Sequence, residues 1–189
     1  LGQITQSDAQ TQEISKDKVI STDPPYYDNI PYADLSDFFY VWLQRSLRNL
    51  YPDQFATISV PKKDELVADK VRHGGEKAAE QFFMSGMKST ITRLKQDSNT
   101  NFPATIYYAF KQSEISVDGV SSTGWATFLE AIIGAGYTVV RTWPLRTEMA
   151  TRMRAAGSNA LANSVVMVCR PKSATAETLT RAEFIRKLK

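Results

Sequence analysis

Four short stretches of the chain are rich in β-branched and aromatic residues, and four longer stretches repeat their apolar residues at intervals of three and four. The first pattern is typical of β-strands, and the second is typical of α-helices with one apolar face. The predicted strands cover residues 18–22, 104–110, 137–143 and 164–170. The predicted helices cover residues 34–51, 75–96, 123–134 and 173–189.

The alternation of these segments predicts an α/β domain in which helices pack on one sheet. Helices connect the first three strands, so we expect those strands to run parallel to one another. Residues 144–163 connect the last two strands without a crossover helix of ordinary length. The strand at 164–170 is therefore expected to run antiparallel, as in a hairpin.

The first predicted helix has the widest apolar face of the four. It begins near Asp34 and ends before Pro52, which cannot continue a helix. We expect its aromatic stripe to face the core rather than to form a binding surface. The stripe consists of Leu35, Phe38, Phe39, Trp42, Leu43 and Leu47.

Composition places the 189-residue chain among ordinary globular proteins, with 42% hydrophobic and 23% charged residues. It has no apolar run of the roughly 20 residues that span a bilayer, so we expect no membrane association. The single cysteine, Cys169, excludes an internal disulfide and fits a reducing cytoplasm. With one cysteine and one histidine, we also expect no metal site.

Positive charge is concentrated near the end of the chain. Residues 141–189 hold ten Lys and Arg against three Asp and Glu, whereas the whole chain has a net charge of +3. Three of these arginines, Arg146, Arg152 and Arg154, lie in the long connection between the last two strands. We interpret them as candidate DNA phosphate contacts. The alternative is that the positive charge only solvates helix surfaces and a tail.

The first predicted strand ends at Asp23-Pro24-Pro25-Tyr26. Two prolines cannot continue a central strand, so Asp23 should stand on a stiff turn at the carboxyl end of the strand. Ligands of open α/β sheets bind at that edge. A carboxylate, the Pro24 carbonyl and an aromatic ring together suit a planar exocyclic amine, which has two N–H donors. The alternative is an ordinary turn after a strand.

The loop after this turn carries further candidates. Tyr27 and Tyr32 are candidates for lining a base pocket, and Asn29 could bind a sugar or a base. The alternative for Asn29 is a plain turn-forming role. The charged segment 62–75 either folds over the site or forms an exposed connection.

These residues carry a family resemblance. The four residues of the turn resemble the catalytic motif of S-adenosylmethionine-dependent amino-methyltransferases. The longer run DPPYYDNIPYADLSDFFYVWLQRSL (residues 23–47) resembles large prokaryotic adenine-specific DNA methylases, which carry a domain of unknown function and sometimes a zinc ribbon. The run WPLRTEM…NALANSVVMVCRP (residues 143–171) is similar to the last strands of that family.

The resemblance implies a partial Rossmann-like methyltransferase sheet whose final strand inserts between its two predecessors. It implies S-adenosylmethionine as cofactor, DNA as partner and adenine N6 as the methyl acceptor. Asp23, Pro24, Pro25 and Tyr26 would then form the catalytic turn. The Asp23 carboxylate and the Pro24 carbonyl would hold the amine, and Tyr26 would stack on a base flipped out of the duplex.

One feature departs from the family. Methyltransferases bind their cofactor through a Gly-rich turn after the first strand, but the only G-x-G here, Gly134-Ala135-Gly136, follows a helix and precedes a strand. We therefore interpret residues 18–172 as the C-terminal half of a catalytic domain, with a flexible leader at 1–17 and a basic helical tail at 173–189. The missing N-terminal half is an expected partner, and the isolated chain is expected to be inactive.

Other functions stay open at this level. Related turns also serve cytosine N4, guanine N2 in RNA and glutamine side chains of proteins. Outside catalysis, the chain would be a folded fragment or an interaction module.

Overall fold

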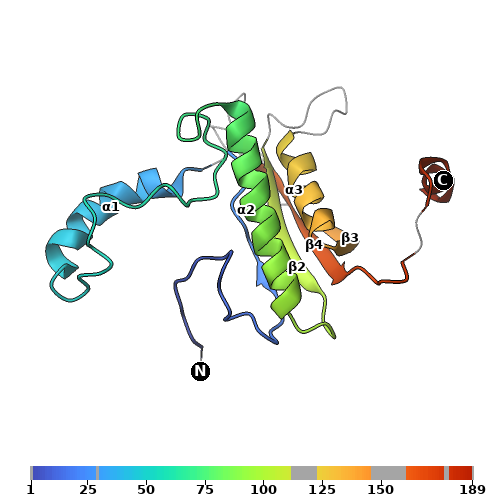
Figure 1. The fold of residues 1–189 in the computed structure, drawn as a ribbon, viewed down its shortest axis with the longest axis horizontal. Helices are drawn as coiled ribbons and strands as arrows, with labels where there is room; N and C mark the ends of the chain where they lie inside the picture. The colour runs from blue at the N-terminus through green and yellow to red at the C-terminus, as the bar shows by residue number, and fades with distance from the viewer. Residues whose placement is uncertain (1, 29, 112–122, 146–160, 177–178, 189) are drawn as a thin grey trace.

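The computed structural model describes residues 2–28, 30–111, 123–145, 161–176 and 179–188. Within these ranges the chain forms four strands and four helices, which confirms the predicted α/β class (Figure 1). The strands are β1 (Ser21–Thr22), β2 (Ala104–Lys111), β3 (Tyr137–Leu145) and β4 (Leu161–Pro171). The helices are α1 (Tyr32–Leu47), α2 (Glu76–Asp97), α3 (Thr123–Gly134) and α4 (Arg181–Leu188).

The four strands form one mixed sheet in the order β1-β2-β4-β3. β1 runs parallel to β2, and β4 runs antiparallel to both of its neighbours. β2 and β3 are therefore parallel to each other, as predicted. The last strand lies between β2 and β3, since one of its edges pairs with β3 and the other pairs with β2.

β1 is shorter than predicted. The sequence predicts a strand over residues 18–22, but only Ser21 and Thr22 pair as a strand with β2. Lys18 forms an isolated parallel bridge to Ser98 instead. Within the described residues β1 pairs with β2 alone, so few hydrogen bonds extend it, and the following prolines end it.

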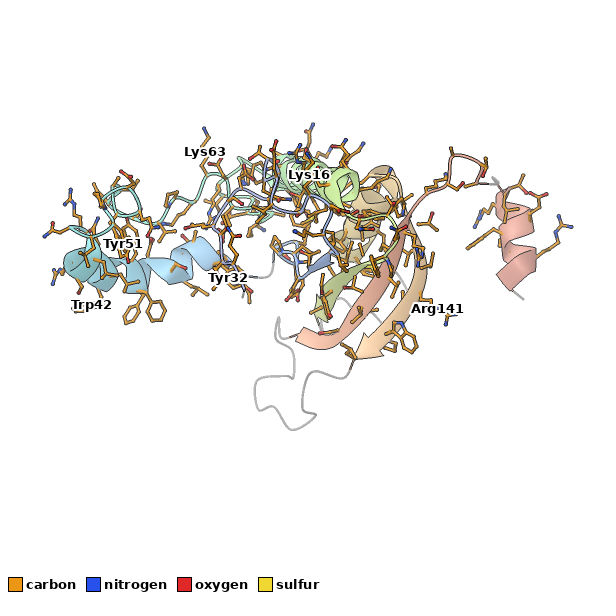
Figure 2. All side chains as sticks on the ribbon, turned by 90° about the horizontal axis from the view of Figure 1, so that it is seen from below. Lys16, Tyr32, Trp42, Tyr51, Lys63 and Arg141 are labelled. Atoms are coloured by element: carbon orange, nitrogen blue, oxygen red, sulfur yellow. The ribbon has the colours of Figure 1, made fainter. Side chains whose placement is uncertain are left out.

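The core lies between the sheet and two helices. α2 and α3 pack side by side on one face of the sheet in both views (Figures 1 and 2). Their apolar stripes follow the helical period, and the alternate residues of the strands meet them. The fully buried side chains here are Phe83 and Met87 of α2, Phe128 and Ile132 of α3, and Ile106, Tyr108, Met167 and Cys169 of the sheet.

The prediction for α1 is wrong in one respect. The helix exists, but its aromatic stripe faces solvent, with Leu35, Phe38, Phe39, Trp42 and Leu43 between 46% and 68% exposed. α1 projects away from the sheet, and residues 48–62 run back along it (Figure 1). We call residues 32–62 the arm. The helical period identifies an apolar face, but it does not determine which surface covers that face.

The opposite face of α1 packs on the returning part of the arm. The Tyr40 hydroxyl and the Gln44 amide both donate to the Thr57 carbonyl, at 2.9 and 2.7 Å. Asp37 accepts a hydrogen bond from the Val60 N–H at 2.8 Å. These bonds fix the rotation of α1, so the stripe points outward as a consequence of the internal packing of the arm.

The C-terminal helix is also shorter than predicted. It begins at Arg181, after Thr180 and Glu183 form reciprocal bonds, with the Thr180 N–H donating to Glu183 at 2.7 Å and the Glu183 N–H donating to the Thr180 hydroxyl at 3.3 Å. This capping box sets the start of α4. None of the helices in the described ranges has the length and apolar content required to cross a membrane.

Candidate functional site

The Asp23-Pro24-Pro25-Tyr26 turn lines a cavity of about 330 Å³ beyond the carboxyl end of β1. Ligands of α/β sheets bind at this edge, and the volume lies at the small end of the usual range for ligand pockets. The cavity is also lined by Ile30 from the following loop, Tyr32 at the start of α1 and Glu65 from the segment after the arm.

The aromatic residue of the turn is anchored on the core. The Tyr26 ring meets the Tyr108 ring of β2 edge to face, with ring centroids 5.4 Å apart. Tyr108 is fully buried and stacks on Phe128 of α3. A short parallel pairing with β2 is therefore enough to place the turn, because the Tyr26 ring adds a second attachment to the same strand.

The Tyr26 hydroxyl donates a hydrogen bond to the Asp23 carboxylate within the same turn. Burial, followed by this hydrogen bond, raises the pKa of Tyr26 well above its ordinary value. The hydroxyl therefore remains a proton donor at neutral pH and orients the carboxylate. The sequence indicated only a stacking role for Tyr26, since a bond between two residues of one turn depends on the backbone path between them.

The chain turns sharply at Tyr27, whose φ of 41° lies in the left-handed region. Such a backbone costs of the order of 1–3 kcal/mol in a residue other than glycine. Two contacts hold it: the Tyr27 carbonyl accepts the Ala68 N–H at 2.9 Å, and the Tyr27 ring packs on Phe83 of α2. Tyr27 consequently lines a neighbouring cavity of about 270 Å³, together with residues 67–71, instead of the cavity at Tyr26.

Glu65 forms the opposite wall of the Tyr26 cavity and holds the start of α1. No side chain caps α1 locally, and Glu65 accepts the Ala33 N–H at 2.9 Å instead. Its other oxygen accepts from Arg72 at 2.7 Å. Arg72 also pairs with Asp34, and the hydrogen bond to Glu65 raises the pKa of Arg72 above its ordinary value. The arm is thus attached to the cavity wall through a charged cluster.

The structure describes six of the predicted site residues and brings five of them to one cavity. Asp23, Pro24, Pro25, Tyr26 and Tyr32 surround one cavity, and Tyr27 lies in the adjacent one. Asn29 lies outside the described residues, as do Arg146, Arg152 and Arg154. The roles assigned to all of these residues stay predictions.

Glu65 was not identified from the sequence. It lies in the charged segment 62–75, for which the sequence allows either a cover over the site or an exposed connection. The segment does contribute a wall of the cavity. The only sequence signal for Glu65 was the density of charge in this segment. The N–H group that it accepts from, that of Ala33, is 32 residues away along the chain.

The G-x-G segment does not form a cofactor turn. Gly136 has a φ of 87° and ends α3, with its N–H donating to the Ile133 carbonyl at 2.9 Å. Glycine suits this position because a φ of this sign strains residues that carry a β-carbon, so Gly136 serves the end of a helix. Within the described part of the chain, this segment therefore does not provide the glycine-rich turn of a methyltransferase cofactor site.

Comparison with protein families, curated proteins and solved structures gave no match to this chain.

Proposed function

We propose that this chain is the acceptor-binding part of an S-adenosylmethionine-dependent methyltransferase that modifies adenine N6 in DNA. The observation that carries the proposal is the cavity at the carboxyl end of β1, which is lined by Asp23, Pro24 and the two tyrosines Tyr26 and Tyr32. The insertion of β4 between β2 and β3 supports it, because this is the strand order that the resemblance implies.

The site residues suit a poorly nucleophilic amine. The lone pair of the adenine amino group is delocalised into the ring, and its two N–H groups need two acceptors. One Asp23 oxygen and the Pro24 carbonyl would bind them and favour a more tetrahedral nitrogen. They would also stabilise the positive charge that develops on this nitrogen in the transition state. The Tyr26 hydroxyl would keep the Asp23 carboxylate oriented, since it already donates a hydrogen bond to that carboxylate.

The aromatic rings would bind the face of a flipped base. Tyr26 and Tyr32 both line the cavity, and their attachments differ. Tyr26 is fixed on Tyr108, whereas Tyr32 begins α1, which Glu65 and Arg72 hold in place. The position of the arm would therefore adjust the width of the base pocket.

The methyl donor would be supplied by S-adenosylmethionine bound largely outside this chain, because the glycine-rich turn is missing. We therefore expect this chain alone to bind the cofactor weakly. Isothermal calorimetry that gives a micromolar Kd, about −8 kcal/mol on the standard scale, would contradict this division of the site.

The acceptor site can be tested by single-turnover methylation in a protein that contains both halves of the domain. Asp23→Ala should lower the methyl-transfer rate about 10²–10³-fold, which is typical for the loss of one preorganised group. A wild-type rate for Asp23→Ala would show that this turn is not the active site.

Fluorescence of 2-aminopurine at the target base tests the stacking role. Tyr26→Ala should weaken base capture by roughly 1–3 kcal/mol. Tyr26→Phe keeps the ring but loses the bond to Asp23, so it should retain base capture and reduce only the rate. Tyr51→Phe, on an exposed tyrosine of the arm, is the matched control. Equal loss of base capture in both Tyr26 variants would argue against stacking.

The same turn geometry would also accept other exocyclic amines. Parallel assays with cytosine in DNA, guanine in RNA and glutamine in peptides would therefore accompany the adenine assay. Methylation of one of these acceptors in preference to adenine would support the assigned site but contradict adenine as its substrate.

A further inference from the structure

α1 has two opposite faces with different roles. One face carries Tyr40, Gln44 and Asp37, which bond to the returning part of the arm. The other carries the α1 stripe, which we define as Leu35, Phe38, Phe39, Trp42 and Leu43. The spacing of three and four residues places these five side chains on one side of the helix. Trp42 lies on the arm, far from the sheet (Figure 2).

The α1 stripe is large for an exposed surface. Its three aromatic side chains are each about 60% exposed or more. At about 200 Å² per aromatic side chain, they alone present roughly 380 Å². The largest apolar patch on a whole monomer is typically about 300–600 Å² and is often an interaction site. The hydrogen bonds on the opposite face of α1 prevent the helix from rotating to bury this surface.

We propose that the α1 stripe binds the α1 stripe of a second copy of this chain, with the two helices antiparallel. The order of side chains along the stripe is nearly the same from either end. A two-fold axis near Phe39 places Leu35 of one copy against Leu43 of the other. It also places Phe38 against Trp42, and the two Phe39 rings against each other. The surface is therefore self-complementary in size and in chemical character.

The charges beside the stripe favour this orientation. Asp34 and Arg45 are eleven residues apart, about three helical turns, so they lie on the same flank of the stripe. A two-fold axis perpendicular to both helices brings the same flank of each copy together. Asp34 of one copy then meets Arg45 of the other at both ends of the interface. Parallel helices would place neither residue opposite a charge of opposite sign.

The Asp34–Arg45 pairs between the two copies determine the relative orientation of the helices more than the affinity of the dimer. Asp34 already pairs with Arg72 in its own chain, and exposed ion pairs contribute little. Arg45 lies over the Trp42 ring, with its guanidinium carbon 5.7 Å from the ring centroid, so it extends the apolar surface as well. Affinity comes mainly from the aromatic side chains.

The expected interface is small. Two stripes with their leucines and flanks bury on the order of 1,000 Å² in total, near the lower limit for a specific interface. The arm carries the stripe away from the sheet, which leaves room for a second arm beside it (Figure 1). We therefore expect a reversible dimer whose population depends on concentration.

Sedimentation velocity of the full chain from about 1 μM to about 1 mM tests the association over the Kd range of small interfaces. The wild-type chain should shift from monomer to dimer, and Phe38→Asp should raise the dimer Kd at least about tenfold, because it places a charge within the apolar contact. Ile58→Asp, on a 94% exposed residue of the same arm, is the matched control and should not change the Kd. A monomer at every concentration, or equal effects of the two variants, would overturn the proposal.

Cysteine cross-linking tests the orientation independently. Phe39→Cys should form a disulfide-linked dimer, whereas Leu35→Cys should do so only when mixed with Leu43→Cys. The native Cys169 is buried, so it does not compete in the folded protein. Efficient self-linking of Leu35→Cys would indicate parallel helices and would refute the antiparallel arrangement.

Discussion

Replacing Glu65 with alanine should loosen the start of α1 and open one wall of the candidate site, while leaving the sheet intact. Glu65 makes two contacts that link this wall to the arm and to Arg72. One oxygen accepts the Ala33 N–H at 2.9 Å, and the other accepts from Arg72 at 2.7 Å. The variant leaves an uncapped helix terminus and a guanidinium that has lost one carboxylate.

The expected size of the effect follows from these two contacts. Removing a helix cap costs about 0.5–2 kcal/mol. Breaking a fully buried ion pair costs about 3–5 kcal/mol. The Arg72 side chain is 16% exposed and still pairs with Asp34 and Asp69 in the variant. The loss of the Glu65–Arg72 pair should therefore cost well below that range. We expect the opening free energy of the first turn of α1 to fall by about 2–3 kcal/mol, which corresponds to roughly 30–150-fold faster amide exchange.

Hydrogen exchange read residue by residue measures this difference. Glu65→Gln keeps an acceptor for the Ala33 N–H but loses the charge that faces Arg72, so its effect should be intermediate. Glu130→Ala, on an exposed residue of α3, serves as the control and should change nothing in α1. Unchanged exchange of the Ala33 amide in Glu65→Ala would show that Glu65 does not hold the arm. A uniform acceleration across α2 and the sheet would show that its effect is global.

Three further predictions concern stability and reactivity. The hydrogen bond from Lys62 lowers the pKa of Asp37 below its usual 3.8. The contribution of the Asp37 carboxylate to the stability of the arm should therefore be present above about pH 4 and disappear as the pH falls through the lowered pKa. An acid titration of the Asp37 carboxyl by NMR checks this. Phe83→Ala should lower the free energy of unfolding by about 3–5 kcal/mol in urea, because Phe83 is fully buried, whereas Phe102→Ala on an exposed ring should change it little. Burial raises the pKa of Cys169 to about 11, so a thiol reagent at pH 8 should react with it only after denaturant unfolds the chain, and fast reaction with the native protein would contradict its buried position.

The sequence was sufficient to predict the elements of the sheet and their directions. The run at 104–110 combines β-branched and aromatic residues, the run at 164–170 is rich in valine, and both are strands in the structure. The presence or absence of a crossover helix then determined which neighbours are parallel. The turn at Asp23 was equally local, because two prolines end a strand wherever they occur. Local constraints of this kind act on neighbouring residues and can be identified without knowing the fold.

The tertiary structure decided which surfaces meet. Leu35 and Trp42 follow the helical period of a buried face, yet they lie in solvent because Tyr40 and Gln44 hold the other side of α1 against the arm. Periodicity shows that a helix has an apolar face, but the identity of the surface that covers it depends on how distant segments are placed.

The same distinction separates the two walls of the candidate site. The Asp23 turn was visible because its four residues are consecutive, whereas Glu65 joins the cavity through bonds to Ala33 and Arg72, of which the first spans 32 residues of sequence. The hydrogen bond from Tyr26 to Asp23 also depended on the fold, because packing of the Tyr26 ring on Tyr108 sets the direction of its hydroxyl. Sequence therefore identified the consecutive residues of the turn, and long-range packing determined which further groups join them and which groups face one another.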